Sequence, residues 1–343
     1  AQEVRRTHLM SVEAPEKPPA DEPAPAPHRR TEARESSANW PVRDRIALAL
    51  CWAAGIALCL IAASITLYML VKGITELNFS YLIERPRTGG DQTGTGGFFD
   101  PIVGTVLLAT IGTLLALPLG VAAAVWLSEY GRPSWLARSV ESGIEILAGT
   151  PSIVFALFGL TFFGQALFGF LSPVGAGALP LGRSFFIAGF MMSFIALPLV
   201  VGSTREALQA IPGHVREASY ALGKTKAATI RRVLIPTARP GIATGGALGL
   251  GRIAGDTAIV VVLLGATLTI QPEPQDSFGN PYHVLRGTGS TLTSYVYNNA
   301  VGEGNSPEKA YAAAFVLLII VLGMTFIVDL ISRNKREPVW IGQ

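Results

Sequence analysis

Six long apolar stretches constrain this chain more than any other feature of its 343 residues. A helix needs about 20 predominantly apolar residues to cross the roughly 30 Å hydrocarbon core of a bilayer, and each stretch reaches that length. They run over residues 46–71, 102–128, 146–171, 184–203, 241–270 and 311–331. Only 15% of the residues are charged, against about a quarter in soluble domains. The sequence therefore predicts an all-α, polytopic membrane protein with six transmembrane helices.

The two ends of the chain are polar and set its expected orientation. Residues 1–45 are rich in Pro, Ala and charge and lack apolar periodicity. Because such segments bury too little apolar surface to fold, we expect a disordered leader. Beyond it, the segments on the side of the two termini hold 12 Lys and Arg residues, against six on the opposite side. The positive-inside rule then places the leader and the tail, residues 333–343, in the cytoplasm.

The segment between the fourth and fifth stretches, residues 204–240, is too long for a turn and has a helical pattern. A glycine at Gly223 permits a sharp change of direction, and Glu217 favours the start of a helix through the macrodipole. Pro236 and Pro240 are expected to close the segment before the fifth stretch. We therefore expect two short helices, joined at Gly223, that protrude from the membrane. A loop that is merely basic would explain its Lys and Arg residues, but not this spacing.

The same segment resembles the EAA loop of ABC-importer permeases, whose pattern is EAA-x3-G-x9-I-x-L-P. The matching residues are Glu217, Ala218, Ser219, Gly223, Val233, Ile235 and Pro236. The resemblance implies a type I ABC-importer permease fold over residues 102–332, in which the loop couples the membrane helices to a cytoplasmic ATPase subunit. The sequence contains no G-x4-G-K-[ST] phosphate-binding pattern. We therefore expect ATP hydrolysis in a separate polypeptide, no enzymatic activity in this chain, and no cofactor or metal.

Three further stretches resemble permeases of the PstA type, which belong to phosphate importers. They are LSEYGR at 127–132, TPSIV at 150–154 and RIAGDTA at 252–258. The resemblance implies import of inorganic phosphate across a bacterial inner membrane by alternating access. It also implies three partners and no nucleic acid: a homologous PstC-like permease, a dimer of PstB-like ATPase subunits and an extracytoplasmic PstS-like phosphate-binding protein. The alternatives are a permease of the paired PstC type, a permease for sulfate or molybdate, and, from another class, a passive channel.

Arg252 lies within the fifth apolar stretch, where a charge costs about 2.5–3.5 kcal/mol and usually marks a functional position. Its planar guanidinium matches two oxygens of a phosphate. Asp256 follows four residues later, so on one helix the two side chains would face the same way. We expect Arg252 to attract the anion and Asp256 to hold Arg252 when the pathway is empty. The alternative is that the pair only ties helices together.

Three other charged residues, Glu141, Glu145 and Arg205, lie close to the ends of the apolar stretches. Glu141 and Glu145, one turn apart at the start of the third stretch, are expected to form a solvated edge rather than part of a gate. Related permeases commonly carry a basic residue near Gly202, and the sequence leaves open whether Arg205 replaces it.

Overall fold

The computed structural model describes residues 41–86, 96–131, 134–174, 179–265, 268–271, 281–300 and 306–332. The chain divides into two compact units, residues 1–63 and 64–343. The described part of the first unit is the beginning of helix α1 (Val42–Glu76). Most of the expected leader and the whole expected tail lie outside the described residues.

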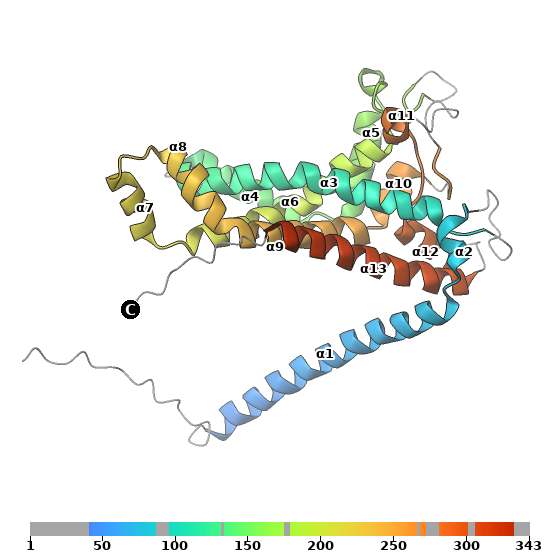
Figure 1. Cartoon of the computed structure of the whole chain (residues 1–343), viewed down its shortest axis with the longest axis horizontal. Coiled ribbons are helices and arrows are strands. Elements are labelled where there is room, and N and C mark those ends of the chain that lie inside the picture. Colours follow the sequence, from blue (N-terminus) through green and yellow to red (C-terminus); the bar gives the residue numbers. More distant parts are fainter. Residues whose placement is uncertain are drawn as a thin grey trace, which may run out of the picture. The chain divides into compact units, whose positions relative to one another are not determined.

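The second unit is a helical bundle (Figure 1). Its long helices are α3 (Phe99–Val125), α6 (Phe185–Gln209), α9 (Ile235–Gly255) and α13 (Pro307–Ser332). The shorter ones are α2 (Phe79–Ile83), α4 (Trp135–Gly149), α5 (Ser152–Phe163), α7 (Gly213–Ala221), α8 (Lys226–Thr229), α10 (Ala258–Leu264), α11 (Pro281–Arg286) and α12 (Leu292–Ala300). Two π-helical turns, η2 (Trp126–Tyr130) and η4 (Ile230–Leu234), and a 3-10 turn, η3 (Ala166–Phe168), complete the helical elements of the described residues.

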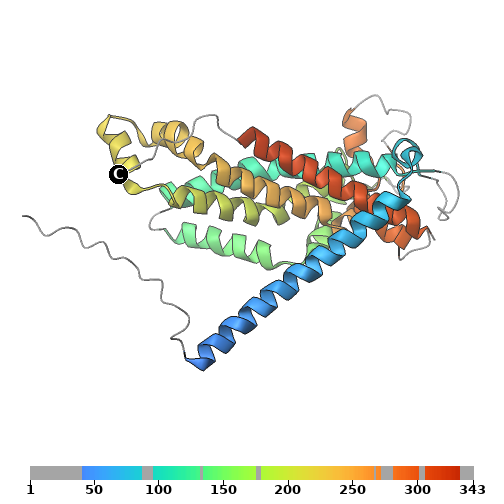
Figure 2. The same cartoon turned by 60° about the horizontal axis from the view of Figure 1, so that its bottom comes forward.

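The two ends of the bundle carry different elements. Figures 1 and 2 show α7 and α8 beyond one end of the long helices, and α2, α11 and α12 at the other. The described residues contain two isolated bridges but no named strand. The all-α prediction is therefore confirmed for the part of the chain that the structure describes.

Within the described ranges, four helices are long and apolar enough to cross a membrane: α1, α3 with η2, α6 and α13. Two bent helix pairs, α4 with α5 and α9 with α10, bring the number to six if each pair counts as one span. All six expected stretches thus correspond to helical segments, but two of them are not straight helices. The expected third stretch contains a bend of 104° and the fifth a bend of 61°.

The larger bend has a local cause at Pro151. A proline disfavours helical geometry at the residue before it, and Thr150 has extended dihedrals, φ −78° and ψ 128°. Helix α4 therefore ends at Gly149 and α5 begins at Ser152. Pro118 and Pro198, by contrast, lie inside α3 and α6, which continue through them.

Helix α6 is the most buried of the spanning helices and lies at the centre of the bundle. Small residues let α3 pack closely against its neighbours. A Cβ at Gly112 would lie 2.8 Å from Ile253 Cδ1 of α9, and one at Gly120 would lie 2.6 Å from Val200 Cγ1 of α6. Such small-residue contacts are typical of helix interfaces in membranes. They bring α3 into direct contact with α6 and with the part of α9 that carries Arg252.

Candidate functional site

The α7–α8 hairpin, residues 213–229, is built around a glycine turn. Gly223 has φ +72°, the left-handed region that a side chain disfavours. The Gly223 amide donates to the Tyr220 carbonyl at 2.9 Å, and the Lys224 amide donates to the Ser219 carbonyl at 3.2 Å. This pair of bonds is a Schellman motif, a common way to end a helix. Thr225 then caps α8 by accepting a hydrogen bond from the Ala228 amide. The predicted turn at Gly223 is confirmed.

The hairpin buries one face and exposes the other. Val215 and Ser219 are buried, and the Ser219 hydroxyl lies 2.8 Å from that of Thr229, which joins α7 to α8. This contact gives a physical reason for a serine where the EAA pattern has alanine. The outward face carries one acidic and several apolar residues: Glu217, Ala218, Tyr220, Ala221 and Leu222. Leu222 is 79% exposed, so this face has the character of a protein contact surface.

Two local expectations for this segment were wrong. Helix α7 begins at Gly213, so Glu217 lies in its middle rather than in its first turn. Pro236 and Pro240 do not close the segment, because α9 starts at Ile235 and runs through both. Pro236 directly follows the π-helical turn η4, in which the Ile235 amide donates to the Ile230 carbonyl, and such a local change of hydrogen bonding accommodates the missing N–H. Pro236 therefore lies in α9, outside the hairpin that holds Glu217, Ala218, Ser219 and Gly223.

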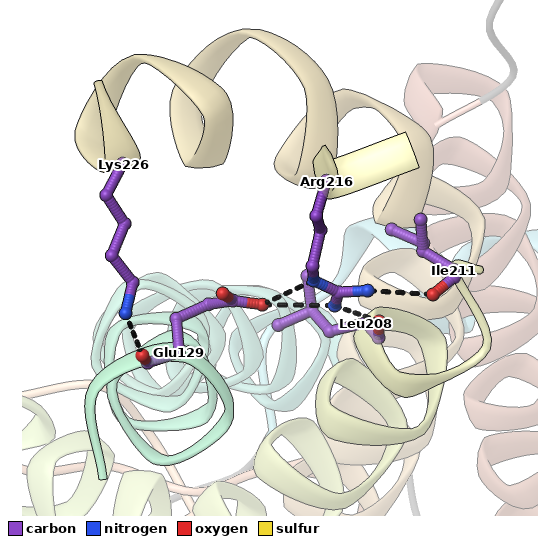
Figure 3. Close-up of polar contacts among 5 residues, drawn as sticks. All are labelled: Glu129, Leu208, Ile211, Arg216 and Lys226. Carbon is purple, nitrogen blue, oxygen red and sulfur yellow. Dashed lines mark hydrogen bonds and ion pairs between the residues drawn. The ribbon is translucent and has the colours of Figure 1, made fainter. Parts of the chain in front are cut away.

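Both helices of the hairpin contact Glu129, in the π-helical turn at the end of α3 (Figure 3). The Arg216 guanidinium donates to Glu129 Oε1 from Nε at 3.1 Å and from Nη2 at 3.0 Å. It also donates to the carbonyls of Ile211 and Leu208 at 2.8 and 2.9 Å. Lys226 Nζ of α8 donates to the Glu129 carbonyl and lies 4.4 Å from the centre of the Tyr130 ring.

A second ion pair lies at the same end of the bundle. Arg205 Nη2 of α6 is 2.6 Å from Glu141 Oε1 of α4, and about a third of each side chain is exposed. The expectation that Glu141 forms only a solvated edge therefore needs correction, because Arg205 partners it. The Glu129 side chain, by comparison, is only 7% exposed.

Arg252 and Asp256 lie at the second candidate position, the break between α9 and α10. Arg252 is exposed in the last turn of α9. Asp256 is buried just beyond the helix, and its Oδ1 accepts a hydrogen bond from the Ile259 amide at 3.0 Å. Among the described residues no ion pair joins the two side chains. The expected pair is wrong because α9 ends at Gly255, so the helical four-residue spacing does not apply.

Comparison with known proteins decides the family. The model of the family described as "binding-protein-dependent transport system inner membrane component" matches residues 116–337. The chain belongs to this family of importer permeases. The matched region includes the hairpin, α9 and the break beside Arg252.

Several relatives of this permease come from phosphate systems. It is 33% identical over 252 residues to the phosphate transport system permease protein PstA 1 of Mycobacterium tuberculosis, covering 71% of this chain and 73% of the relative. It is 30% identical over 250 residues to the phosphate transport system permease protein PstC of Xylella fastidiosa, covering 69% and 72%. The resemblance to phosphate-type ABC-importer permeases is therefore confirmed. Both PstA and PstC proteins are among the relatives.

Solved structures confirm the fold of the permease. A bacterial ABC transporter involved in the import of the acidic polysaccharide alginate matches with a TM-score of 0.57 and 14% identity, covering 86% of this chain and 97% of that chain. The structure of the alginate transporter in complex with an alginate-bound periplasmic protein also gives a TM-score of 0.57, with 15% identity. At this identity the likeness establishes the ABC-importer permease fold alone.

Sequence reasoning missed the contacts at Glu129. Arg216 and Lys226 were counted only as basic residues of a loop, and Glu129 only as part of a motif. Glu129 and Arg216 lie 87 positions apart, so no local periodicity relates them. The sequence does show an acidic residue, Glu129, at the end of the second apolar stretch and several basic residues in the later segment 204–240. It does not show which of these basic residues would pair with Glu129.

Proposed function

We propose that this permease is the PstA-type subunit of an ATP-driven importer of inorganic phosphate in a bacterial inner membrane. The names of its relatives support phosphate as the cargo. The observation that carries the proposal is Arg252, an exposed guanidinium within an apolar span and beside a helix break. Discontinuous helices form the substrate sites of many transporters.

The exposure of Arg252 supports a role in the pathway. A guanidinium that faced lipid would carry the cost of a charge in hydrocarbon, whereas one that faces a water-filled pathway would not. We therefore assign the exposed side of α9 near Arg252 to the pathway, completed by a homologous PstC-like permease. Asp256 has a different role from the one first expected: it caps α10 and so fixes the break next to Arg252.

The outward face of α7 supports coupling to an ATPase. Glu217, Ala218 and Leu222 are exposed there, while the opposite face is anchored to the bundle. We assign this face to a PstB-like ATPase subunit, one of two in the assembled importer. The excess of Lys and Arg on this side supports our assignment of it, with both termini, to the cytoplasm. A PstS-like binding protein would deliver phosphate at the opposite end.

Uptake of labelled phosphate into proteoliposomes that contain the assembled importer tests the proposal. The variant Arg252→Gln should lose at least about 90% of ATP-dependent uptake, because the anion loses its one cationic partner in this span. The matched control is Arg239→Gln, which removes another exposed arginine of α9 far from the break and should retain uptake.

Three results would contradict the proposal. Normal uptake by Arg252→Gln would remove the role of that residue. Equal competition by sulfate and unlabelled phosphate would identify a permease for oxyanions in general. Phosphate flux through this chain without an ATPase subunit would indicate a channel.

A further inference from the structure

One residue of η2, the turn that continues α3, contacts both helices of the hairpin. Glu129 accepts Arg216 of α7 through its carboxylate and Lys226 of α8 through its carbonyl. Figure 3 shows the two basic side chains reaching Glu129 from the hairpin. A pocket of about 600 Å³ lies at this contact, lined by Ser128, Glu129, Tyr130, Gln209, Arg216 and Lys226. Polar bonds join the hairpin to η2 here, beside an apolar cluster in which Val215 of α7 packs with Leu208 of α6 and, at its edge, Val125 of α3.

The Arg216 guanidinium is held in one orientation. Its four hydrogen bonds connect three segments: α7 itself, the end of α6 through the Leu208 and Ile211 carbonyls, and η2 through Glu129. The pair is largely buried, with 22% of the Arg216 side chain and 7% of the Glu129 side chain exposed. A charge-assisted contact in which two donors share one carboxylate restricts direction as well as distance. Displacement of α7 must therefore displace η2 or break this contact.

Helix α3 leads from this contact to the pathway residue. Glu129 lies in η2, which continues α3 without a break. Further along α3, Gly112 packs against Ile253, the residue after Arg252. Packed helices and ion pairs of this kind carry coupling between distant sites when they connect an element that has two arrangements. In addition, π-helical turns such as η2 are rare and occur frequently at functional sites.

We propose that Glu129, Arg216 and Lys226 form a clamp that transmits movement of the hairpin to α3. In this proposal Glu129 and Arg216 are positioning residues: they act on the pathway through α3 and do not touch the anion. The clamp rests on the proposed function, because it links ATPase docking to translocation. It differs from docking itself, which uses the outward face of α7.

The test compares two glutamates that pair with arginines at the same end of the bundle. Glu129→Ala removes the carboxylate contact of the clamp, the pair with Arg216, and leaves the carbonyl that Lys226 bonds. The matched control Glu141→Ala removes the more exposed pair with Arg205. Both are assembled with the partner permease, ATPase subunits and binding protein in proteoliposomes. The measurements are copurification of the ATPase subunit, ATP hydrolysis, and phosphate taken up per ATP hydrolysed. Coupling between sites is typically worth about 5- to 150-fold.

For Glu129→Ala we expect unchanged copurification of the ATPase and continued ATP hydrolysis, with at least a tenfold fall in phosphate per ATP, on the order of that range. Glu141→Ala should stay within about twofold of wild type, since its pair with Arg205 is the more exposed of the two and joins α4 to α6, not the hairpin to α3. If the Glu129→Ala chain does not fold, so that no permease accumulates in the membrane, Glu129→Gln keeps the shape and should show a smaller fall of the same kind.

The clamp proposal is overturned if Glu129→Ala and Glu129→Gln keep the wild-type ratio, or if Glu141→Ala lowers it equally. It is also overturned if Glu129→Ala loses the ATPase subunit, because the residue would then build the docking face. The wild-type importer separates the two proposals. Failure of the wild type to take up phosphate contradicts the proposed function, whereas normal wild-type uptake with a fully coupled Glu129→Ala contradicts the clamp alone.

Discussion

At Gly223 the strain of a left-handed backbone can be tested separately from steric clashes of an added side chain. A Cβ added at Gly223 would meet nothing within 4 Å, although φ is +72°. Substitution by alanine therefore adds strain without a clash. For a residue with a Cβ, left-handed geometry costs about 1–2 kcal/mol. Asparagine is larger than alanine but adopts this geometry more readily, because its side chain bonds locally.

Alanine should therefore destabilise the turn more than asparagine does, although asparagine is the larger residue. Gly223→Ala should weaken the Schellman motif by about 1–2 kcal/mol, which corresponds to an opening equilibrium raised about 5- to 30-fold. Gly223→Asn should stay within about threefold of wild type. Hydrogen exchange at the Lys224 amide reports the opening directly, because that amide donates to the Ser219 carbonyl in the closed motif.

The same variants should rank in the same order for phosphate taken up per ATP hydrolysed, because a frayed end of α7 weakens the connection between ATPase and membrane helices. An asparagine variant that exchanges as fast as the alanine variant, or faster, would refute the conformational reasoning. That order would follow side-chain volume, and the glycine would then be needed for close contact with the ATPase subunit.

Two further substitutions test packing at the two functional positions. Ser219→Ala should lower the free energy of unfolding by about 1 kcal/mol, because Thr229 keeps its bond to the Thr225 carbonyl; a loss above about 3 kcal/mol in chemical denaturation would contradict this. Gly112→Val should lower stability by about 1–3 kcal/mol, since its Cβ would lie 2.8 Å from Ile253 Cδ1. The control Gly251→Ala meets nothing within 4 Å and should leave the thermal midpoint unchanged or raised; equal midpoints for the two glycine variants would contradict the packing argument.

The parts of the structure that could be predicted depend on local signals. Apolar length located the six stretches, since crossing a bilayer sets a minimum number of residues. The turn at Gly223 was also predictable, because a glycine between two helical patterns favours a left-handed cap. The hairpin that holds Glu217, Ala218 and Ser219 followed from the same spacing.

The parts that could not be predicted depend on where helices end and on distant residues. Pro151 ends a helix, whereas Pro118 and Pro198 do not; in membrane helices neighbouring segments decide whether a proline breaks the helix. Arg216 meets Glu129 across 87 positions because α7 folds back against the end of α3. Such a contact depends on tertiary packing, which a single sequence does not specify.

The corrected position of Asp256 changes how Arg252 would handle an anion. Every arriving phosphate would have to displace a carboxylate that was paired with Arg252. Breaking that pair would cost free energy and so reduce the net affinity of Arg252 for phosphate. Asp256 instead accepts the Ile259 amide at the start of α10, where a carboxylate also favours the positive end of the helix. The Asp256 carboxylate is thereby engaged with the Ile259 amide, and among the described residues it forms no ion pair with Arg252. In the proposed function, the exposed Arg252 beside a break fixed by Asp256 would bind an oxyanion and release it when movement of α3 shifts the adjoining Ile253.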